Sequence, residues 1–264
     1  MLADQFETFL FDLDGTVYLN HIPIPHARDS LIKLRRDGKT VRFLTNDPRP
    51  TQAEVIKRLA KMGIEAHQQE VFTSGQATAR HLVKNGVRSA YVVGSPGLIS
   101  EIRQAGVEVV ESGQPEAVVV GGDERTCYDH LLKATRFILD GAKFVATNPD
   151  GTYPTPEGPI PGAGAIVAAV QATTGEAPVA IVGKPHAALF KLALEGSNAK
   201  GERVAMVGDN PSTDILGARR AGITGILVAK ETSLFSSNRD IPTPDAIISD
   251  LSFLFDPHTH IDTR

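Results

Sequence analysis

The sequence predicts an α/β protein built mainly on parallel sheets. Short apolar runs rich in β-branched and aromatic residues alternate with amphipathic segments of helical period. The runs are continuously apolar, which is typical of strands that helices cover on both faces. The runs expected as strands are 8–11, 40–45, 90–94, 117–122, 143–147, 179–183, 203–208 and 225–229. This pattern leaves open whether they form one wide sheet or two smaller ones.

Three segments between these runs carry recognisable helix ends. Thr51 and Glu54 have the spacing of a capping box, and Gly63 ends the segment that they open. The expected helices are 25–37, 51–62 and 126–140. The Pro- and Gly-rich segment 148–164 suits neither element and is expected to be a loop. Its last glycines, Gly162 and Gly164, are expected to start a helix, since they follow no strand as a dinucleotide-binding loop would.

Composition narrows the class of protein. With 264 residues, 41% of them hydrophobic, the chain is long enough for one large or two modest domains. A formal net charge of -4 gives no basic field for a nucleic acid polymer. Cys127 is the only cysteine, which excludes an internal disulfide and fits a reducing compartment. The N-terminus carries acids where a signal peptide carries positive charge, and no apolar run approaches a membrane span, so we expect a cytoplasmic, non-membrane protein.

Four of the expected strands are followed by polar residues. Ligands of open α/β sheets bind outside the carboxyl ends of the strands, so we expect these residues to meet at one edge. Asp12 and Asp14 point to the same side of a strand, where two charges about 7 Å apart repel by roughly 2 kcal/mol at an effective dielectric near 20. The full set is Asp12, Asp14, Gly15, Thr45, Asn46, Lys184, Asp209, Thr213 and Asp214.

This set fits a divalent cation together with a phosphate. Carboxylate oxygens are the ligands that Mg²⁺ prefers, and the metal removes their repulsion. Lys184, the Thr45 hydroxyl and backbone N–H groups near Gly15 would attract the phosphate. An aspartate such as Asp12 is an established nucleophile for phosphoryl groups, and a second carboxyl, Asp14, can give and take the proton. The two acids must then titrate differently.

Four motifs occur in a fixed order: DxDGT at 12–16, TN at 45–46, GKP at 183–185 and GDxxxTD at 208–214. Taken together they resemble the haloacid dehalogenase (HAD) superfamily of phosphatases. The chain is similar to the subclass of NagD-type and 4-nitrophenyl phosphatases. The resemblance extends over essentially the whole chain.

The resemblance implies a Rossmann-like core with a parallel sheet and an inserted α/β cap domain of the C2 type, and therefore two sheets. The core is expected at 1–77 and 179–264, and the cap, which selects the substrate, at 78–178. Specificity is expected in the loops 94–97, 122–126 and 147–158 and around residues 47–49.

The resemblance also implies roles for the acids. Asp12 would be the nucleophile and a metal ligand. Asp14 would be the general acid and base, with its backbone carbonyl on the metal, and Asp209 would complete the Mg²⁺ site. Thr213 and Asp214 would lie behind these ligands, where Asp214 orients metal-bound waters or the lysine.

The phosphate would be held by the remaining residues of the motifs. The resemblance implies that Thr45 and Asn46 contact phosphoryl oxygens with the backbone at Gly15. Lys184 would neutralise both the nucleophile and the phosphate.

Two stretches depart from the family pattern, one after the TN motif and one after the GKP motif. Asp47 stands where the family often has a second Asn, and an extra carboxylate there should disfavour highly anionic substrates. Pro48 removes a backbone donor. His186 follows the GKP motif and is expected at the start of the next helix.

The predicted function is Mg²⁺-dependent hydrolysis of small phosphate monoesters through an aspartyl-phosphate. Candidate substrates are nucleoside monophosphates, sugar or glycerol phosphates, phosphoglycolate and 4-nitrophenyl phosphate. A phosphotransferase or mutase with the same intermediate, and a non-catalytic phospho-binding module, are the alternatives. The expected partner is a small phosphorylated metabolite, with no nucleic acid polymer or membrane, and the resemblance is compatible with a homodimer. The tail 256–264 is expected to be solvated.

Overall fold

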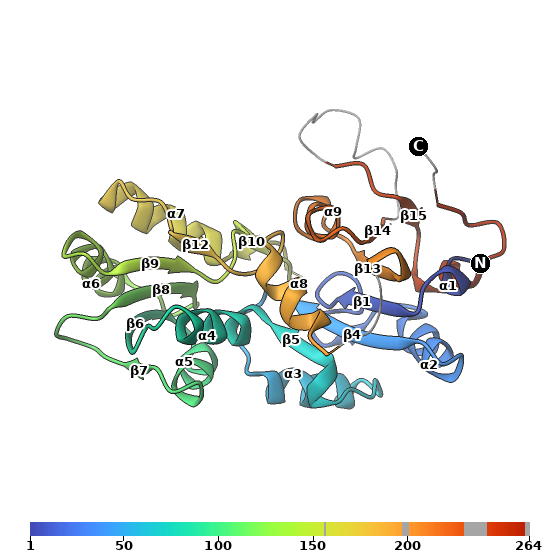
Figure 1. Cartoon of the computed structure of the whole chain (residues 1–264), viewed down its shortest axis with the longest axis horizontal. Coiled ribbons are helices and arrows are strands. Elements are labelled where there is room, and N and C mark those ends of the chain that lie inside the picture. The colour runs from blue at the N-terminus through green and yellow to red at the C-terminus, as the bar shows by residue number, and fades with distance from the viewer. Residues whose placement is uncertain (156, 197–200, 230–241, 262–264) are drawn as a thin grey trace. The chain divides into compact units, whose positions relative to one another are not determined.

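Figure 1 shows a computed structural model of the chain, which describes residues 1–155, 157–196, 201–229 and 242–261. Residue 156 of the predicted loop 147–158 and residues 262–264 of the predicted tail lie outside the described residues. The chain folds as two compact units. The first unit is Met1–Leu44, Ile56–Phe72 and Pro185–Arg264, and the second is Thr45–Val55 and Thr73–Lys184.

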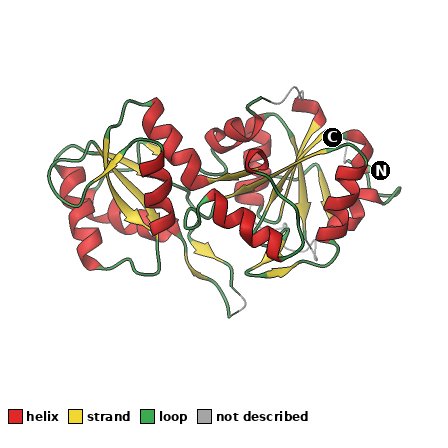
Figure 2. Cartoon of the chain, turned by 90° about the horizontal axis from the view of Figure 1, so that it is seen from below, coloured by secondary structure: helices red, strands yellow, loops and turns green. Residues whose placement is uncertain are grey.

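The first unit is built on a six-stranded sheet of order β15-β14-β13-β1-β4-β5. In this sheet β1 pairs in parallel with β13 on one side and with β4 on the other. Every residue of β1 is buried, because helices cover both faces of the sheet (Figure 2). The strands are β1 (Thr8–Asp12), β4 (Thr40–Thr45), β5 (Val71–Thr73), β13 (Val204–Gly208), β14 (Thr224–Val228) and β15 (Ala246–Ile248).

Short helices and turns surround this sheet. A small antiparallel hairpin, β2 (Tyr18–Leu19) with β3 (Ile22–Pro23), follows β1. The α-helices are α1 (Leu2–Gln5), α2 (Ala27–Arg36), α3 (Gln52–Lys61), α8 (Ala187–Leu194) and α9 (Leu216–Ala221); α3 belongs to this unit from Ile56 onward. The 3₁₀-helices are η1 (Gln68–Glu70), η2 (Gly201–Arg203) and η5 (Leu251–Phe255), and η3 (Pro211–Ile215) is a π-helix.

The second unit is built on a five-stranded parallel sheet of order β12-β9-β8-β6-β7. Its strands are β6 (Ser89–Gly94), β7 (Glu108–Val109), β8 (Ala117–Gly122), β9 (Lys143–Ala146) and β12 (Ala180–Ile181). Its helices are α4 (Ser74–Lys84), α5 (Pro96–Gln104), α6 (Tyr128–Leu139) and α7 (Ala163–Thr174). Figure 1 shows α6 and α7 on one face of the sheet and α4 and α5 on the other. Tyr91, Val118, Phe144 and Val170 form part of the core beneath α6 and α7.

Most predicted elements are confirmed. Each of the eight apolar runs contains a strand, and they form two sheets. The capping box is present: the Thr51 N–H donates to Glu54 Oε2 (2.8 Å), and the Glu54 N–H donates to Thr51 Oγ1 (3.2 Å). His186 is the residue that precedes α8, as predicted.

The prediction of a loop throughout 148–164 is wrong in part. An antiparallel hairpin, β10 (Thr152–Tyr153) with β11 (Ile160–Pro161), lies within this segment. Strands of two residues beside prolines are too short to show a periodic pattern. The helix start expected near Gly162 is confirmed, since α7 begins at Ala163.

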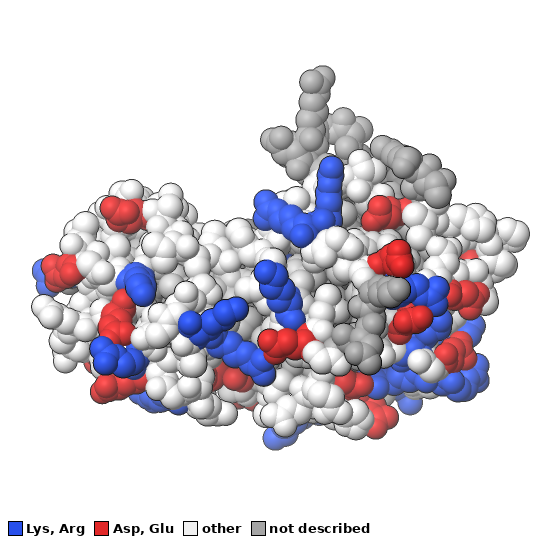
Figure 3. All heavy atoms as spheres, viewed as in Figure 1, with Lys and Arg blue, Asp and Glu red and all other residues white. Residues whose placement is uncertain are grey.

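The surface drawn in Figure 3 carries charges of both signs. Lys and Arg side chains are interspersed with Asp and Glu on the face drawn in Figure 3. None of the helices in the described part of the chain has the length and apolar character needed to cross a bilayer.

Candidate active site

The first unit places Asp12 at the carboxyl end of its central strand. Asp12 is the last residue of β1, is buried and lies beside Leu44 of β4. The chain then turns tightly around the Leu13 carbonyl, which accepts the N–H groups of residues 16–18 at 2.9–3.3 Å. The turn requires a φ of +97° at Gly15, a conformation that glycine adopts without strain.

Three carboxylates gather at this end of the sheet. One oxygen of each of Asp12, Asp209 and Asp214 lies within 4.8 Å of the others. Asp209 directly follows β13, the neighbour of β1, and Asp214 belongs to η3. The Asp214 carboxylate lies beside those of Asp12 and Asp209, and its expected place behind the metal ligands stays a prediction. Asp14 is half-buried, two residues beyond Asp12, and its carboxylate is outside this group of three.

Local geometry brings Asp209 and Asp214 into place. A Cβ at Gly15 would collide with the Asp209 carboxylate, and a Cβ at Gly208 would collide with the Asp214 side chain. The Asp214 N–H donates to the Asn210 carbonyl (2.8 Å), while the Asn210 N–H donates to Asp214 Oδ2 (3.1 Å). The two glycines therefore provide the room in which the carboxylates approach one another.

This donor set fits a divalent cation. Two unit charges about 4.8 Å apart repel by roughly 3 kcal/mol at an effective dielectric near 20, and a cation bound between the carboxylates would remove this repulsion. Carboxylate oxygens are hard ligands suited to Mg²⁺, which binds through a few of them and substrate phosphate.

In the second unit, the Asn46 side chain holds Lys184 by its backbone. Asn46 Oδ1 accepts the Lys184 N–H (2.8 Å), and Asn46 Nδ2 donates to the Lys184 carbonyl (2.9 Å) and to Asp150 Oδ2 (2.9 Å). Lys184 is 1% exposed. Thr45 is buried at the end of β4, where its hydroxyl accepts the Asp47 N–H (3.0 Å). The structure therefore brings Asn46 and Lys184 together, but the binding of the Asn46 side chain to the Lys184 backbone was not predicted from the sequence.

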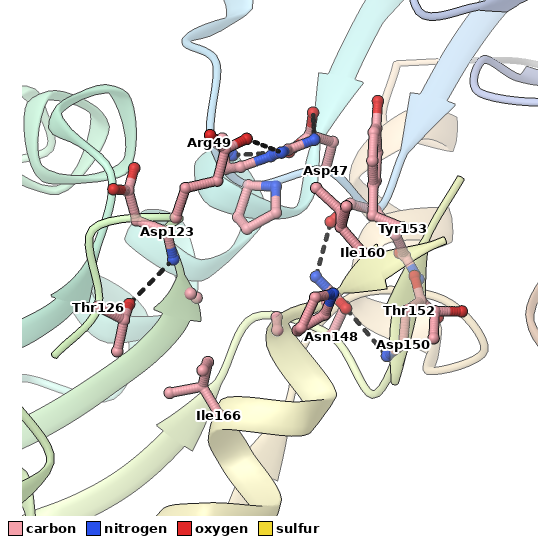
Figure 4. Close-up of a pocket in the computed structure, with 18 of the residues that line it drawn as sticks. Asp47, Arg49, Asp123, Thr126, Asn148, Asp150, Thr152, Tyr153, Ile160 and Ile166 are labelled. Carbon is pink, nitrogen blue, oxygen red and sulfur yellow. Dashed lines mark hydrogen bonds and ion pairs between the residues drawn. The ribbon is translucent and has the colours of Figure 1, made fainter. Parts of the chain in front are cut away.

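The second unit also contains a cavity of about 600 Å³, shown in Figure 4. It is lined by residues 46–49, by the loop after β8 and by the segment from Asn148 to α7. Among the described lining residues, Arg49 is the one cation. The acids are Asp47, Asp123, Glu124, Asp150 and Glu157. The cavity is therefore strongly acidic, apart from Arg49.

Two of these acids are bound by an arginine two residues further on. Asp47 Oδ1 accepts the backbone N–H (3.0 Å) and Nε (2.7 Å) of Arg49, and Asp47 Oδ2 accepts Nη2 (3.1 Å). Asp123 makes the same three contacts with Arg125, at 2.9, 2.8 and 3.2 Å. We call these two segments, 47–49 and 123–125, the Asp-x-Arg turns. The spacing of aspartate and arginine is visible in the sequence, but it did not predict these contacts.

The Arg125 partner shifts the titration of Asp123. Hydrogen bonds from the Arg125 side chain lower the pKa of Asp123 below its usual value, against the effect of burial. The backbone N–H of Arg125 and the charges of Arg125 and Arg49 act in the same direction. Asp123 therefore stays ionised to lower pH than an ordinary aspartate.

Comparison with known proteins places these features in a family. Residues 9–108 match the family model of haloacid dehalogenase-like hydrolases, and residues 181–254 match a second model of HAD-hydrolase-like proteins. An acid sugar phosphatase from Staphylococcus aureus is 34% identical over 241 residues, which cover 90% of this chain and 93% of the relative. The chain belongs to the haloacid dehalogenase-like hydrolases.

Solved structures of HAD proteins agree with this assignment. The chain is similar to the 4-nitrophenylphosphatase from Thermotoga maritima (TM-score 0.87, 34% identity, covering 95% of this chain and 97% of the other). It is also similar to a glycerol phosphate phosphatase from Mycobacterium tuberculosis, solved in complex with magnesium (TM-score 0.86, 32% identity, 96% and 77%). NagD from E. coli K-12 has a TM-score of 0.83, at 31% identity and coverages of 94% and 98%. The chain is therefore a NagD-like HAD phosphatase with a Rossmann-like core and a cap, as predicted.

Proposed function

We propose that this HAD phosphatase hydrolyses small phosphate monoesters in a Mg²⁺-dependent reaction through an aspartyl-phosphate on Asp12. The gathering of Asp12, Asp209 and Asp214 within 4.8 Å supports the metal site most directly. Asp12, Asp209 and the Asp14 carbonyl would hold the Mg²⁺, with Asp214 beside them. Bound Mg²⁺ would neutralise the carboxylates and the phosphate, so that an anionic nucleophile can approach phosphorus.

Asp12 and Asp14 divide the reaction into two displacements. An Asp12 carboxylate oxygen attacks phosphorus, and the bond to the ester oxygen breaks as Asp14 donates its proton to that oxygen. Asp14 then removes a proton from water, whose oxygen attacks phosphorus and releases Asp12 and inorganic phosphate. Asp14 therefore ends each cycle protonated again.

Residues of the second unit are proposed to hold the phosphoryl group. The Thr45 hydroxyl, the backbone at Gly15 and Asn46 and the Lys184 ammonium would bind its oxygens. The Asn46 side chain supports this arrangement by fixing the Lys184 backbone through two hydrogen bonds. Thr213, buried in η3, would support the metal side of the site.

The substrate class is proposed from the relatives and from the cavity. One relative is named an acid sugar phosphatase and one structural neighbour a glycerol phosphate phosphatase. We assign sugar and polyol phosphates as the substrates, with residues 78–178 as the cap that selects them. A cytoplasmic location fits the single, exposed Cys127.

Phosphate release by the purified protein tests the proposal. Release from glycerol 3-phosphate and 4-nitrophenyl phosphate should require Mg²⁺, stop with EDTA and return on addition of Mg²⁺. Asp12→Asn should lower kcat at least about 1,000-fold, because the nucleophile is lost. Asp37→Asn, at an exposed helix end of the first unit, is the matched control and should keep wild-type activity.

The proposal is contradicted by substantial turnover in Asp12→Asn or in EDTA. A burst of ³²P that stays on the wild-type protein after acid quench, and is absent from Asp12→Asn, would identify the aspartyl-phosphate.

A further inference from the structure

Arg49 is held in one place inside the acidic cavity. Its guanidinium makes the two hydrogen bonds to Asp47, stacks on the Tyr153 ring (4.0 Å to the centroid) and lies 3.5 Å from Glu124. Its carbonyl accepts a hydrogen bond from Ser95 Oγ (2.7 Å). Figure 4 shows Arg49 and Asp47 joined at the edge of the cavity. The neighbours of Arg49 therefore fix the position of its guanidinium and balance its positive charge.

The Asp47 carboxylate is well shielded from water, which makes it a strong partner for Arg49. The Asp47 side chain is 3% exposed and the Arg49 side chain 26% exposed. A planar guanidinium that binds one carboxylate through two parallel hydrogen bonds is less available to a second anion. A substrate carboxylate entering the cavity would have to displace Asp47 to reach Arg49, and would also meet Asp150.

Uncharged, hydroxylated groups meet no such obstacle. Carboxylate oxygens accept hydrogen bonds from alcohol groups, and the hydroxyls of Thr126 and Thr152, which line the same cavity, both donate and accept. The cavity is thus complementary to a polyol and poorly complementary to a second anionic group.

Building on the proposed function, we propose that Asp47 is a specificity-determining residue. It neutralises Arg49 and thereby restricts the phosphatase to esters whose alcohol part carries no second anionic group. The cavity begins at Asn46, next to Thr45 in the chain, and Thr45 is proposed above to hold the phosphoryl group. On that proposal, the selection acts on the group attached to the phosphate.

Two substrates of the same size test the proposal. Glycerol 3-phosphate and 3-phosphoglycerate differ in one position, where a CH₂OH group is replaced by a carboxylate. The measured quantity is the ratio of kcat/KM for 3-phosphoglycerate to kcat/KM for glycerol 3-phosphate. We expect a ratio below 0.1 for the wild type and at least about a tenfold rise in Asp47→Asn, because the amide keeps the shape of Asp47 but leaves the Arg49 charge available.

Two further variants show whether the rise in the ratio depends on Arg49 or follows from the loss of any carboxylate in the cavity. Arg49→Gln should lower the ratio further, and the double variant D47N/R49Q should lose the gain seen in D47N. Asp123→Asn is the matched control, since it removes a carboxylate from the other Asp-x-Arg turn, whose Arg125 side chain is 70% exposed. It should change the ratio less than about threefold.

Each outcome decides the question. Equal effects of Asp47→Asn on both substrates, or equal shifts in D47N and D123N, overturn the role of Asp47. If Asp47→Asn does not fold, a ratio that is unchanged in Arg49→Gln overturns it instead. A wild type that hydrolyses 4-nitrophenyl phosphate but shows no preference between the two esters overturns this proposal alone. A wild type that releases no phosphate from any of the three overturns the proposed function as well.

Discussion

The two units use aspartate in opposite ways. In the first unit, Asp12, Asp209 and Asp214 gather so that their carboxylates face one another. In the second unit, Asp47 and Asp123 are each bound by the arginine two residues further along the chain. Carboxylates that face one another can share a cation, whereas a carboxylate bound by its own arginine is already satisfied and determines what else can enter. The surroundings of an aspartate, more than its presence, thus decide its role.

The two arrangements also form in different ways. The Asp-x-Arg turns are local, since each carboxylate binds atoms two residues away. The cluster depends on the sheet, because β1 and β13 must lie side by side before Asp12 and Asp209 can meet. We therefore expect small backbone changes to damage the cluster far more than the turns.

Of the variants that test this comparison, Gly15→Ala should lower kcat/KM the most. The new Cβ would collide with the Asp209 carboxylate, and Ala is strained at a φ of +97°. We expect at least about a 100-fold loss of kcat/KM, with a raised Mg²⁺ requirement, as the carboxylates are pushed apart. Steady-state kinetics over a Mg²⁺ titration would measure both quantities.

Gly38→Ala separates the collision from the strain. Gly38 also has a positive φ, +73°, but a Cβ there would meet nothing within 4 Å. The substitution should cost about 1 kcal/mol of stability and leave the activity unchanged. Equal losses of activity in both variants would mean that strain, and not the approach to Asp209, explains the Gly15→Ala result.

Asn46→Asp should have the next largest effect, because it adds a carboxylate that no arginine binds. The new oxygen would face Asp150 Oδ2 and the Lys184 carbonyl, both of which now accept from the Asn46 amide. We expect kcat to fall about 10- to 100-fold and the melting temperature to fall by several degrees, since a buried charge is left uncompensated.

A swap of the two side chains checks this explanation. In N46D/D150N the amide and the carboxylate exchange places, so the contact between positions 46 and 150 can form again, and part of the lost stability should return. Asn85→Asp is the control at an exposed helix end, where the amide donates to the His81 carbonyl (2.8 Å), and should have little effect on kcat. No recovery of stability in the double variant would argue against the role of Asp150.

Much of the first unit follows from the sequence for a physical reason. Parallel strands end at one edge of a sheet, so acids that directly follow two apolar runs are brought together whatever the intervening chain does. This rule correctly places Asp12 near Asp209. It does not place the Asp214 carboxylate, because Asp214 follows no strand and the turn η3 decides where its side chain lies.

One contact of the second unit could not be predicted, because it depends on tertiary packing. Asn46 and Lys184 are 138 residues apart, and no local pattern indicates that one side chain binds the backbone of the other. The hairpin within 148–164 was not predicted, because proline suppresses the usual strand signal. By contrast, an aspartate followed two residues later by arginine is visible at 47–49 and 123–125, and side-chain to backbone bonding of this kind has a known local preference.

The dependence of stability on pH offers the most modest test of the comparison. Arg125 lowers the pKa of Asp123, so the carboxylate contributes stability above the pKa of an unfolded aspartate, about 3.9, and loses it as pH falls through the lower folded value. Asp123→Asn should therefore melt about 1–2 °C below the wild type at pH 7, a small shift because the Arg125 side chain is largely exposed. The two melting curves should converge below about pH 3. Burial raises the pKa of Glu70, but the hydrogen bonds from the Arg35 side chain and the His67 backbone N–H, with the charges of Arg35 and His67, together lower it. Glu70→Gln should therefore give the same sign. A difference that grows as pH falls would show that these arginines do not stabilise the charged form.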